Sequence, residues 1–280
     1  MNIPIKLIKS FSQNRDAGNP AGVVIDANNL TDNQILQITR DLGFGESAFL
    51  QKSDKADYKI RLFSVEGEVN VCVTATIAAA FVIGNITNLE RITFETKLGV
   101  RNIDRKKDGL ILLEQVKPNF FNTKIDRNKI AKLLSVPEDS FLDYPMVIGD
   151  AGTPKLIIPM KSLDSLFAIK PDLKGISEYC KETGAQGFYP FSLETKKSDS
   201  DFHARQFNPL AGIDEDPVTG IAAAVLAQYL KDYHIIEKSS LVGEQGYIIN
   251  KPGEIVIEMT DSELWVGGYA VEYEDKTIEL

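Results

Sequence analysis

Two segments carry the residues best suited to bind a small molecule, and each opens an apolar stretch. Val73-Thr74 begins one stretch, and Gly220-Ile221 begins the other. If both stretches are helices, their first turns present backbone N–H groups without helical partners, which favour a carboxylate or a phosphate. We therefore expect a small anionic substrate. Thr74 and Thr219 are candidate hydroxyl donors to it, and helix capping explains both threonines equally well.

A carboxylate and a thiol stand at the same two places. Asp216 precedes Pro217, an arrangement common at helix starts, where the carboxylate caps the helix. The same carboxylate can accept a hydrogen bond from a substrate amine or hydroxyl. At the other segment, a Cys72 thiolate would be stabilised by the helix dipole. A small buried hydrophobic residue explains Cys72 just as well.

The chain has few residues that could bind a metal ion or form a disulfide. The only histidines, His203 and His234, are far apart in sequence, and neither Cys72 nor Cys180 lies in a metal-binding pattern. We expect no metal site and no disulfide. Epimerisation by a pair of cysteines is also disfavoured, because only Cys72 stands at one of the two segments.

The elements that must position these residues repeat along the chain at an interval of 144 positions, as between Arg61 and Arg205. Over about seventy positions in consistent order, coincidence is the minor explanation. The matches at this interval are Gly43-Phe44 with Gly187-Phe188, Phe63 with Phe207, 77–80 with 221–224, Gly99 with Gly243, Gly109 with Gly253, Ile111 with Ile255 and Glu114 with Glu258. The interval predicts that Cys72 corresponds to Asp216.

Local patterns predict the individual elements. Short segments rich in β-branched and aromatic residues, typical of strands, lie at 3–11, 21–27, 46–52 and 58–64. Thr31–Leu42 combines a capping threonine with apolar residues at helical spacing. The small, apolar segment 73–84 predicts a helix buried on all sides, and 217–231 is its counterpart. Extended runs follow at 91–97, 101–115, 240–249 and 254–260, with a hairpin turn at Asp108-Gly109.

Together these patterns predict an α+β fold with two pseudo-symmetric domains. Each domain is expected to be a curved, mostly antiparallel sheet or barrel wrapped around a central helix. We expect an N-terminal half at 1–118, joined by a C-terminal strand at 264–280, and a C-terminal half at 119–263. The polar region at 117–126 is the expected linker.

Composition excludes several classes of function. The chain has 280 residues, of which 40 are acidic and 31 basic, and the resulting formal charge of −9 repels nucleic acids and anionic lipids. No run approaches the roughly 18 apolar residues of a membrane span. We expect a cytoplasmic protein with a small-molecule partner and without nucleic-acid or membrane partners. A homodimer is the default expectation for its assembly.

Three motifs resemble those of the PhzF family, the phenazine-biosynthesis-like proteins with the diaminopimelate-epimerase fold. They are Gly18-Asn19-Pro20-Ala21-Gly22-Val23, Gly45-Glu46-Ser47-Ala48-Phe49 and Asp214-Glu215-Asp216-Pro217-Val218-Thr219-Gly220. The resemblance covers essentially the whole chain. It implies an active site between two domains, no metal or organic cofactor, and isomerisation by proton transfer.

The resemblance also assigns roles to individual residues. Glu46 matches the catalytic glutamate of the family, and it falls on Pro190 at the interval of 144, so its role is performed once per chain. Partial burial raises the pKa of a carboxyl group, as a carboxylate base working near neutral pH requires. A solvated glutamate at a strand end is the alternative. Asp216 matches the conserved aspartate. The expected substrate-binding residues are Asn19, Cys72, Val73, Thr74, Thr219, Gly220 and Ile221.

The chain departs from the family at both segments. Where the family has Gly-His-x-Thr, this sequence has Val73-Thr74-Ala75-Thr76, and where it has Thr-Gly-Ser-Ala-His, this sequence has 219–223 as TGIAA. Our leading hypothesis is an isomerase or epimerase in which Glu46 removes and returns a proton while Asp216 orients the substrate. The alternative is a catalytically lapsed member that binds a small molecule or a protein. A scaffolding protein ranks below both.

Overall fold

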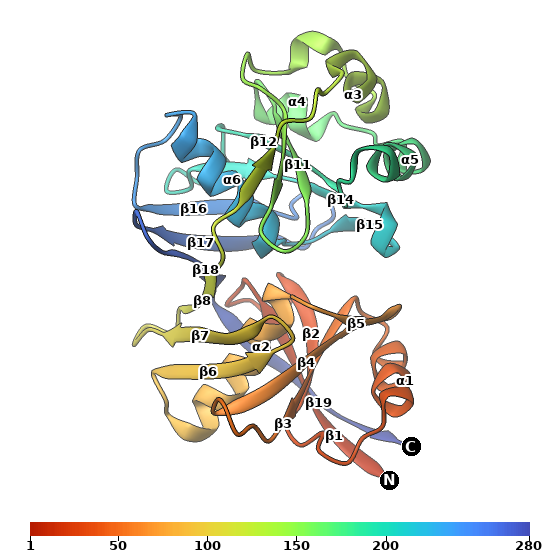
Figure 1. Ribbon diagram of the computed structural model, residues 1–280, viewed down its shortest axis with the longest axis vertical. Coiled ribbons are helices and arrows are strands. Elements are labelled where there is room, and N and C mark those ends of the chain that lie inside the picture. The colour runs from red at the N-terminus through yellow and green to blue at the C-terminus, as the bar shows by residue number, and fades with distance from the viewer. The chain divides into compact units, whose positions relative to one another are not determined.

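The computed structural model describes residues 1–280, which divide into two compact units. Unit 1 comprises Met1–Glu114 and Trp265–Leu280, and unit 2 comprises Gln115–Leu264 (Figure 1). The C-terminal segment belongs to unit 1 because β19 (Ala270–Glu279) pairs antiparallel with β1 (Asn2–Ser10) along its length. No helix in the structure is both long enough and apolar enough to cross a membrane.

Unit 1 is a curved sheet around one helix. Its elements are β1, β2 (Asn19–Val24), α1 (Asp32–Leu42), β3 (Glu46–Gln51), β4 (Tyr58–Ser64), β5 (Gly67–Val69), α2 (Val73–Thr87), β6 (Arg91–Thr96), β7 (Gly99–Arg105), β8 (Ile111–Gln115), β18 (Leu264–Gly268) and β19. The pairs β2–β3 and β4–β6 are parallel. The pairs β1–β19, β1–β2, β3–β4, β4–β5, β6–β7 and β7–β8 are antiparallel.

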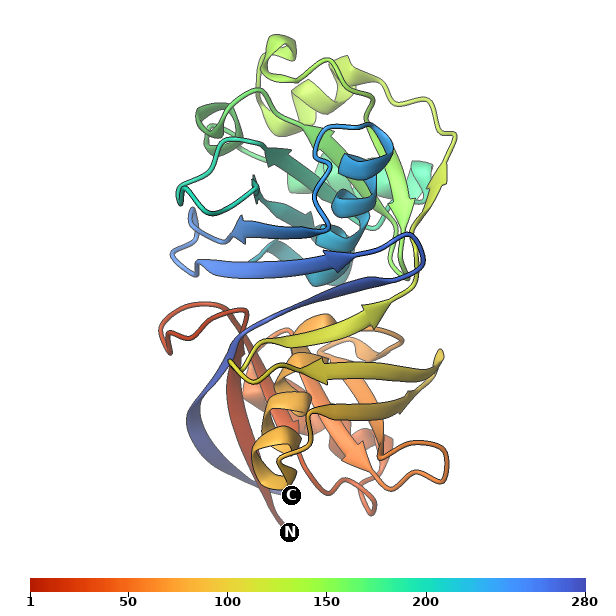
Figure 2. The ribbon, with the colours of Figure 1, turned by 90° about the vertical axis from the view of Figure 1, so that its left-hand side faces the viewer.

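Helix α2 forms the centre of unit 1. It contacts β1, β2, β3, β4, β7 and β19, and Figure 2 shows the strands curving around it. Its first eight residues are all buried, and four of the fifteen residues of the helix are alanine. A helix that is apolar on all sides must be enclosed, and small side chains let the strands approach closely.

Helix α1 covers the opposite face of the sheet. Its N-cap Thr31 and Gln34 form a capping box, and its C-cap Gly43 has a φ of 71°. Ile35, Ile38 and Leu42 pack against side chains from β1, β3 and β4, among them Phe49 and Phe63. The predicted capped helix at Thr31–Leu42 is confirmed. The strands of unit 1 thus have an inner face toward α2 and an outer face toward α1.

Unit 2 has the same kind of centre. Its elements are β9 (Asn119–Phe121), α3 (Arg127–Leu134), a 3-10 turn (Glu138–Ser140), β10 (Val147–Asp150), β11 (Lys155–Pro159), α4 (Leu163–Phe167), α5 (Leu173–Thr183), β12 (Phe188–Ser192), β13 (Phe202–Ala204), β14 (Gln206–Asn208), a 3-10 turn (Pro209–Ala211), β15 (Ile213–Asp216), α6 (Gly220–Asp232), β16 (Ser240–Gln245) and β17 (Gly253–Met259). Helix α6 is buried over most of its length and contacts β11 and β17.

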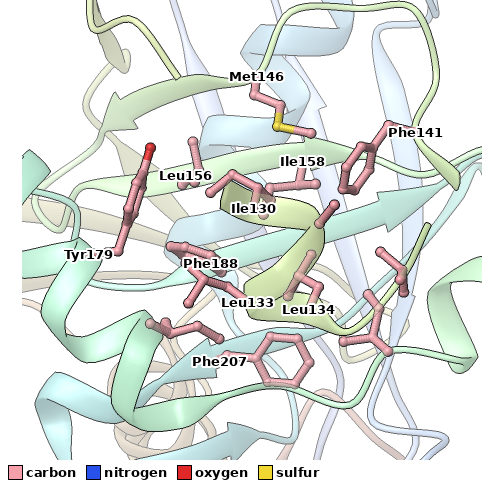
Figure 3. Close-up of a cluster of buried hydrophobic side chains, with 14 of the residues drawn as sticks. Ile130, Leu133, Leu134, Phe141, Met146, Leu156, Ile158, Tyr179, Phe188 and Phe207 are labelled. Atoms are coloured by element: carbon pink, nitrogen blue, oxygen red, sulfur yellow. The ribbon is translucent and has the colours of Figure 1, made fainter. Parts of the chain in front are cut away.

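The outer face of unit 2 carries more helix than that of unit 1. Side chains of α3 and α5 pack with residues of β10, β11, β12 and β14 in one apolar cluster (Figure 3). Ile130, Leu133 and Leu134 of α3 meet Phe188 and Phe207 of the sheet there. Cys180 of α5 belongs to this cluster, and burial raises the pKa of its thiol to about 11. Cys180 is therefore a packing residue.

The two units share one order of strand pairing. Parallel β2–β3 and β4–β6 of unit 1 have parallel counterparts in β11–β12 and β13–β16 of unit 2. The antiparallel pairs β1–β19, β1–β2 and β6–β7 likewise correspond to β10–β9, β10–β11 and β16–β17. The α+β class predicted from the sequence, with a mostly antiparallel sheet around a central helix, is confirmed in each unit.

The predicted constant interval is wrong outside β4. The glycine C-caps of α1 and α5, Gly43 and Gly184, lie 141 positions apart, whereas the N-caps of α2 and α6, Cys72 and Thr219, lie 147 apart. Unit 2 has longer turns, including the 3-10 turn at Pro209–Ala211. The interval between corresponding residues of the two units therefore increases along the chain. Cys72 therefore corresponds to Thr219, and not to Asp216.

The counterpart of Glu46 also changes. Glu46 pairs with Ser64, and the pairing of Phe188 with Phe207 places Gly187 opposite Asn208 in unit 2. Because Ser64 and Asn208 occupy the same place in their hairpins, Glu46 corresponds to Gly187 rather than to Pro190. The expected linker at 117–126 is also wrong in part, because 119–121 forms β9 and pairs with β10.

Candidate active site

The start of α2 is capped by the side chain of a cysteine, Cys72. Cys72 is the N-cap, and its Sγ accepts a hydrogen bond from the Ala75 backbone N–H at 3.2 Å. The Thr76 hydroxyl donates to the Cys72 carbonyl at 2.7 Å. Only 3% of Cys72 is exposed. The thiol is therefore buried, as the explanation by a small buried residue expects, and it also caps the helix, which was not predicted from the sequence.

Thr74 is held from two strands in the first turn of α2. Its backbone carbonyl accepts a hydrogen bond from the Ser10 hydroxyl at 2.8 Å. Its own hydroxyl oxygen lies 3.4 Å from the Asn19 amide nitrogen, which donates to it. Thr74 and its neighbour Val73 are buried. Thr74 is thus not a cap, because Cys72 holds that position, and its hydroxyl bonds to β2.

Glu46 lies on the inner face of the unit 1 sheet, at the first residue of β3. Phe49 packs in the outer cluster with α1, so alternation along the strand places Ser47 outside and Glu46 inside. In the parallel register of β2 and β3, Gly22 pairs with Ser47. Glu46 therefore lies beside Ala21, two residues after Asn19 on β2. Glu46 is half-buried. Glu46 and Asn19 are the first residues of the neighbouring parallel strands β3 and β2, so they lie at the same end of the sheet, which we call the inner rim of unit 1.

The start of α6 is arranged differently. Thr219 is the N-cap residue, but its side chain makes no capping bond to the helix and donates instead to Asp216 Oδ2. Asp216 is the last residue of β15, three positions before the cap. Asp216 is therefore not the N-cap residue of α6, because Thr219 holds that position. In the first turn, Gly220 and Ile221 are buried.

We call the first turn of each central helix, with the residues that lead into it, an entrance: Cys72–Thr76 at α2 and Asp216–Ile221 at α6. Gln245, the last residue of β16, forms hydrogen bonds to several groups at the α6 entrance. Its Nε2 donates to the Asp216 carbonyl at 2.8 Å and to Thr219 Oγ1 at 3.2 Å. Its Oε1 accepts from the Thr219 N–H at 3.2 Å and from the Tyr189 hydroxyl at 3.1 Å. Gln245 and Tyr189 are both fully buried.

Neither Gln245 nor Tyr189 was predicted from the sequence. The available signal is the glycine that follows Gln245. Gly246 has a φ of 85°, and a Cβ there would lie 2.2 Å from the Lys251 carbonyl oxygen and 2.7 Å from that of Pro217. Only glycine lets the end of β16 come this close to the segment before α6.

Each entrance is braced from the outer face by an arginine and a glutamate. In unit 1, Arg61 on β4 bonds both carboxylate oxygens of Glu68, at 2.9 and 2.8 Å. In unit 2, Arg205 bonds both oxygens of Glu215 at the same two distances. Glu68 and Glu215 each stand four residues before the N-cap of the central helix. The braces therefore hold the strands that lead into α2 and α6.

The brace of unit 1 changes the acidity of its glutamate. The hydrogen bonds from Arg61 lower the pKa of Glu68 to about 2, against the opposing effect of partial burial. Lys97 adds a contact to Glu68 at 2.8 Å. In unit 2, burial, with a smaller contribution from the Asp216 charge, raises the pKa of Tyr189, so its hydroxyl stays protonated and able to donate.

Neither histidine bonds to a residue at the start of α2 or α6 in the contacts described above. His203 is fully buried on β13, with Nδ1 2.7 Å from Glu244 Oε2, and His234 is exposed beside Glu237. The structure contains no cluster of three or more His, Cys, Asp or Glu side chains arranged to hold a metal ion.

Comparison with known proteins identifies the family. Residues 8–275 match the model of the phenazine biosynthesis-like protein family. The chain is 35% identical over 262 residues to a Bacillus subtilis protein named uncharacterized isomerase YfhB, covering 91% of this chain and 89% of that one. The chain therefore belongs to the phenazine biosynthesis-like family, and homologues in this family are named isomerases.

Solved structures agree with this assignment. The crystal structure of a Bacillus anthracis phenazine biosynthesis protein of the PhzF family is similar over 100% of both chains, with a TM-score of 0.93 and 27% identity. A hydroxyproline epimerase from Agrobacterium vitis, with 10% identity and a TM-score of 0.61, covers 99% of this chain and 92% of its own. That second likeness shows the fold alone.

Proposed function

We propose that this chain is an isomerase or epimerase that needs no cofactor and acts on a small carboxylate-bearing metabolite. In this proposal Glu46 removes a proton next to an activating group of the substrate and returns it at another position or from another side. Asp216 orients the substrate by accepting a hydrogen bond from an amine or hydroxyl. Membership of a family with named isomerases supports the reaction class.

The observation that carries the proposal is the unequal placement of carboxylates at two otherwise corresponding entrances. Glu46 stands at the inner rim of unit 1, where unit 2 has Gly187. Asp216 stands beside the start of α6, where unit 1 has Val69. One group that moves a proton and another that orients the substrate require such an inequality. Two equivalent bases would not produce it.

The neighbours of Glu46 support a role as base. Glu46 is half-buried, and the adjacent rim position is Asn19, a buried amide that already donates to Thr74. Desolvation is one of the ways in which a protein makes a carboxylate a stronger base, as a proton-moving role requires. The proposal of an anionic substrate rests on the positive ends of α2 and α6, because the N-terminus of a helix favours negative charge.

The test is deuterium incorporation from solvent. The protein is incubated in D2O with a pool of small carboxylate metabolites, and mass spectrometry identifies any that gains one mass unit only when protein is present. We expect the wild-type chain to label at least one metabolite. Glu46→Gln should label it at least about 100-fold more slowly, because general acid–base catalysis contributes about that much or more.

The matched control is Glu68→Gln, which makes the same chemical change at a glutamate on the outer face of unit 1. It should leave labelling within about threefold of wild type under conditions where it remains folded. Full labelling by Glu46→Gln would contradict the proposed role of Glu46. If the wild-type protein labels nothing in a broad pool, the isomerase proposal fails.

One observation favours a second candidate function, that of a family member that binds a small molecule without converting it. The helix entrances are closed by buried side chains without acid or base function, namely Val73, Thr74, Ile221 and Ala223. Under this alternative a metabolite from the same pool raises the melting temperature without gaining deuterium. Thermal shift with each pool fraction, beside the labelling experiment, separates binding from turnover.

A further inference from the structure

The hydrogen bonds around Gln245 have fixed directions. Its Oε1 accepts from the Thr219 backbone N–H, which can only donate, and also from the Tyr189 hydroxyl. The amide is therefore locked in one orientation, and its Nε2 must face the Asp216 carbonyl and Thr219 Oγ1. All of these contacts lie within unit 2, and Gln245 has no exposed surface.

This orientation determines what the Thr219 hydroxyl does. Because Gln245 Nε2 donates to Thr219 Oγ1, that oxygen is used as an acceptor and its single proton is directed to Asp216 Oδ2. A hydroxyl that donates to a carboxylate favours the ionised form of that carboxylate. The threonine also gives up the capping bond that an N-cap residue usually makes to its helix.

We propose that Gln245 is a positioning residue that acts on Asp216 through Thr219, in a one-way relay from amide to hydroxyl to carboxylate. The relay directs the threonine proton to Oδ2 of Asp216 and favours the ionised form of this carboxylate, which can only accept hydrogen bonds. The group recognised there is therefore a donor, an ammonium or a hydroxyl. This last step rests on the function proposed above, whereas the relay itself does not.

Several polar and charged groups of unit 2 stand near Asp216. Gln206 stands opposite it on β14, and Tyr189 on β12 is protonated. Arg205 and Glu215 bond each other at the neighbouring strand positions, whose side chains point to the other face, and Asp214 is exposed. These charges stay in place when Thr219 is changed, so a change in the titration of Asp216 reports on the relay.

The relay is tested by following Asp216 directly. The full-length protein is labelled with carboxyl-¹³C aspartate, the Asp216 resonance is assigned with Asp216→Asn, and its midpoint of titration is measured by NMR. Thr219→Val removes the hydroxyl but keeps the shape of the side chain. We expect it to raise the midpoint by about one pH unit, a tenfold change in proton affinity. Thr219→Ser, which keeps the hydroxyl, should restore the wild-type midpoint.

Gln245 itself is tested by Gln245→Met, which keeps its length and removes its hydrogen bonds. We expect a midpoint shift in the same direction as in Thr219→Val. Tyr189→Phe is the matched control, because it removes one hydrogen bond from the same buried amide and leaves the relay intact. It should lower the melting temperature and move the Asp216 midpoint by less than about 0.3 unit.

The outcomes separate the relay from a structural role. If Thr219→Val leaves the Asp216 midpoint unchanged, the relay is overturned, whatever Gln245→Met does to folding. If Tyr189→Phe shifts the midpoint as far as Thr219→Val, the amide acts through general packing and the relay is likewise overturned. None of these measurements needs a substrate. A failure of the isomerase proposal, seen as absent deuterium labelling, therefore leaves this test unaffected.

Discussion

The two helix entrances differ in where their polar groups are directed. At α2, the side chain of the N-cap Cys72 turns back to its own helix and Thr74 bonds to Asn19. At α6, the side chain of the N-cap Thr219 turns away from its helix to Asp216, and Gln245 holds both. One scaffold thus gives a closed helix start in unit 1 and a carboxylate held by its neighbours in unit 2.

The carboxylates show the same inequality. Neither Glu46 nor Asp216 has an acidic counterpart in the other unit, whereas the arginine–glutamate braces occur in both. Groups present in both units hold the fold, because both units need the same strand to lead into the same helix. Groups present in one unit are the candidates for chemistry, which requires each role once.

The largest stability effect is expected from the unit 2 brace. Arg205→Met leaves Glu215 without its partner at a site where 5% of the arginine and 12% of the glutamate side chain are exposed. It also leaves the Leu166 and Ile169 carbonyls without the bonds that Arg205 donates. Breaking such a pair costs about 3–5 kcal/mol. Urea unfolding measures this loss.

Arg61→Met is the matched change in unit 1. Its third bond goes to Asp32, whose side chain is 79% exposed, so water replaces part of what is lost. We expect a loss of about 1–3 kcal/mol, smaller than in unit 2. Equal losses in both variants would contradict the view that the brace of unit 2 is the more deeply buried of the two.

The unit 1 brace also predicts a pH dependence. Because the folded pKa of Glu68 is lowered to about 2, its contribution to stability is fully present above its unfolded pKa, near 4.3. The contribution is lost as the pH falls from about 4.5 towards 2. Glu68→Gln has no such proton, so its stability difference from wild type should be constant between pH 5 and 7 and shrink below about pH 4.5.

Urea unfolding of both proteins at pH 7, 5, 4 and 3 measures this difference. A gap that stays constant down to pH 3 would show that the bond between Arg61 and Glu68 does not hold the carboxylate in its ionised form. Glu263→Gln, at an exposed position of unit 2, is the control for the general loss of a negative charge.

The smallest effect is expected at the cap of α2. Cys72→Ala removes the acceptor of the Ala75 N–H and should cost about 1 kcal/mol or less. Cys72→Ser supplies a better acceptor of similar size and should be neutral or stabilising. A larger loss in Cys72→Ser than in Cys72→Ala, measured by thermal unfolding, would show that packing of the sulfur outweighs capping.

Local signals in the sequence were sufficient for the central elements. The threonine cap and helical spacing at Thr31–Leu42 and the alanine-rich segment at 73–84 each predict their helix without reference to the rest of the chain. The strand at 58–64 was predicted with its observed bounds. These elements are determined by patterns within about fifteen residues, which a single sequence displays.

Features that depend on distant segments were not predictable in this way. The interval of 144 holds at Arg61 and Arg205, but turns of unequal length shift it on either side, and nothing in the composition marks where residues are added. Gln245 was missed for a related reason. A glutamine at a strand end is ordinary until the fold brings it to Thr219 and Asp216.

The division of labour between Glu46 and Asp216 is tested most directly by steady-state kinetics on the metabolite that the labelling experiment identifies. We predict that Glu46→Gln lowers kcat at least about 100-fold with little change in KM, and that Asp216→Asn chiefly raises KM. The reverse pattern, or two variants with the same loss in kcat and the same KM, would contradict the assignment of proton transfer to Glu46 and of substrate orientation to Asp216.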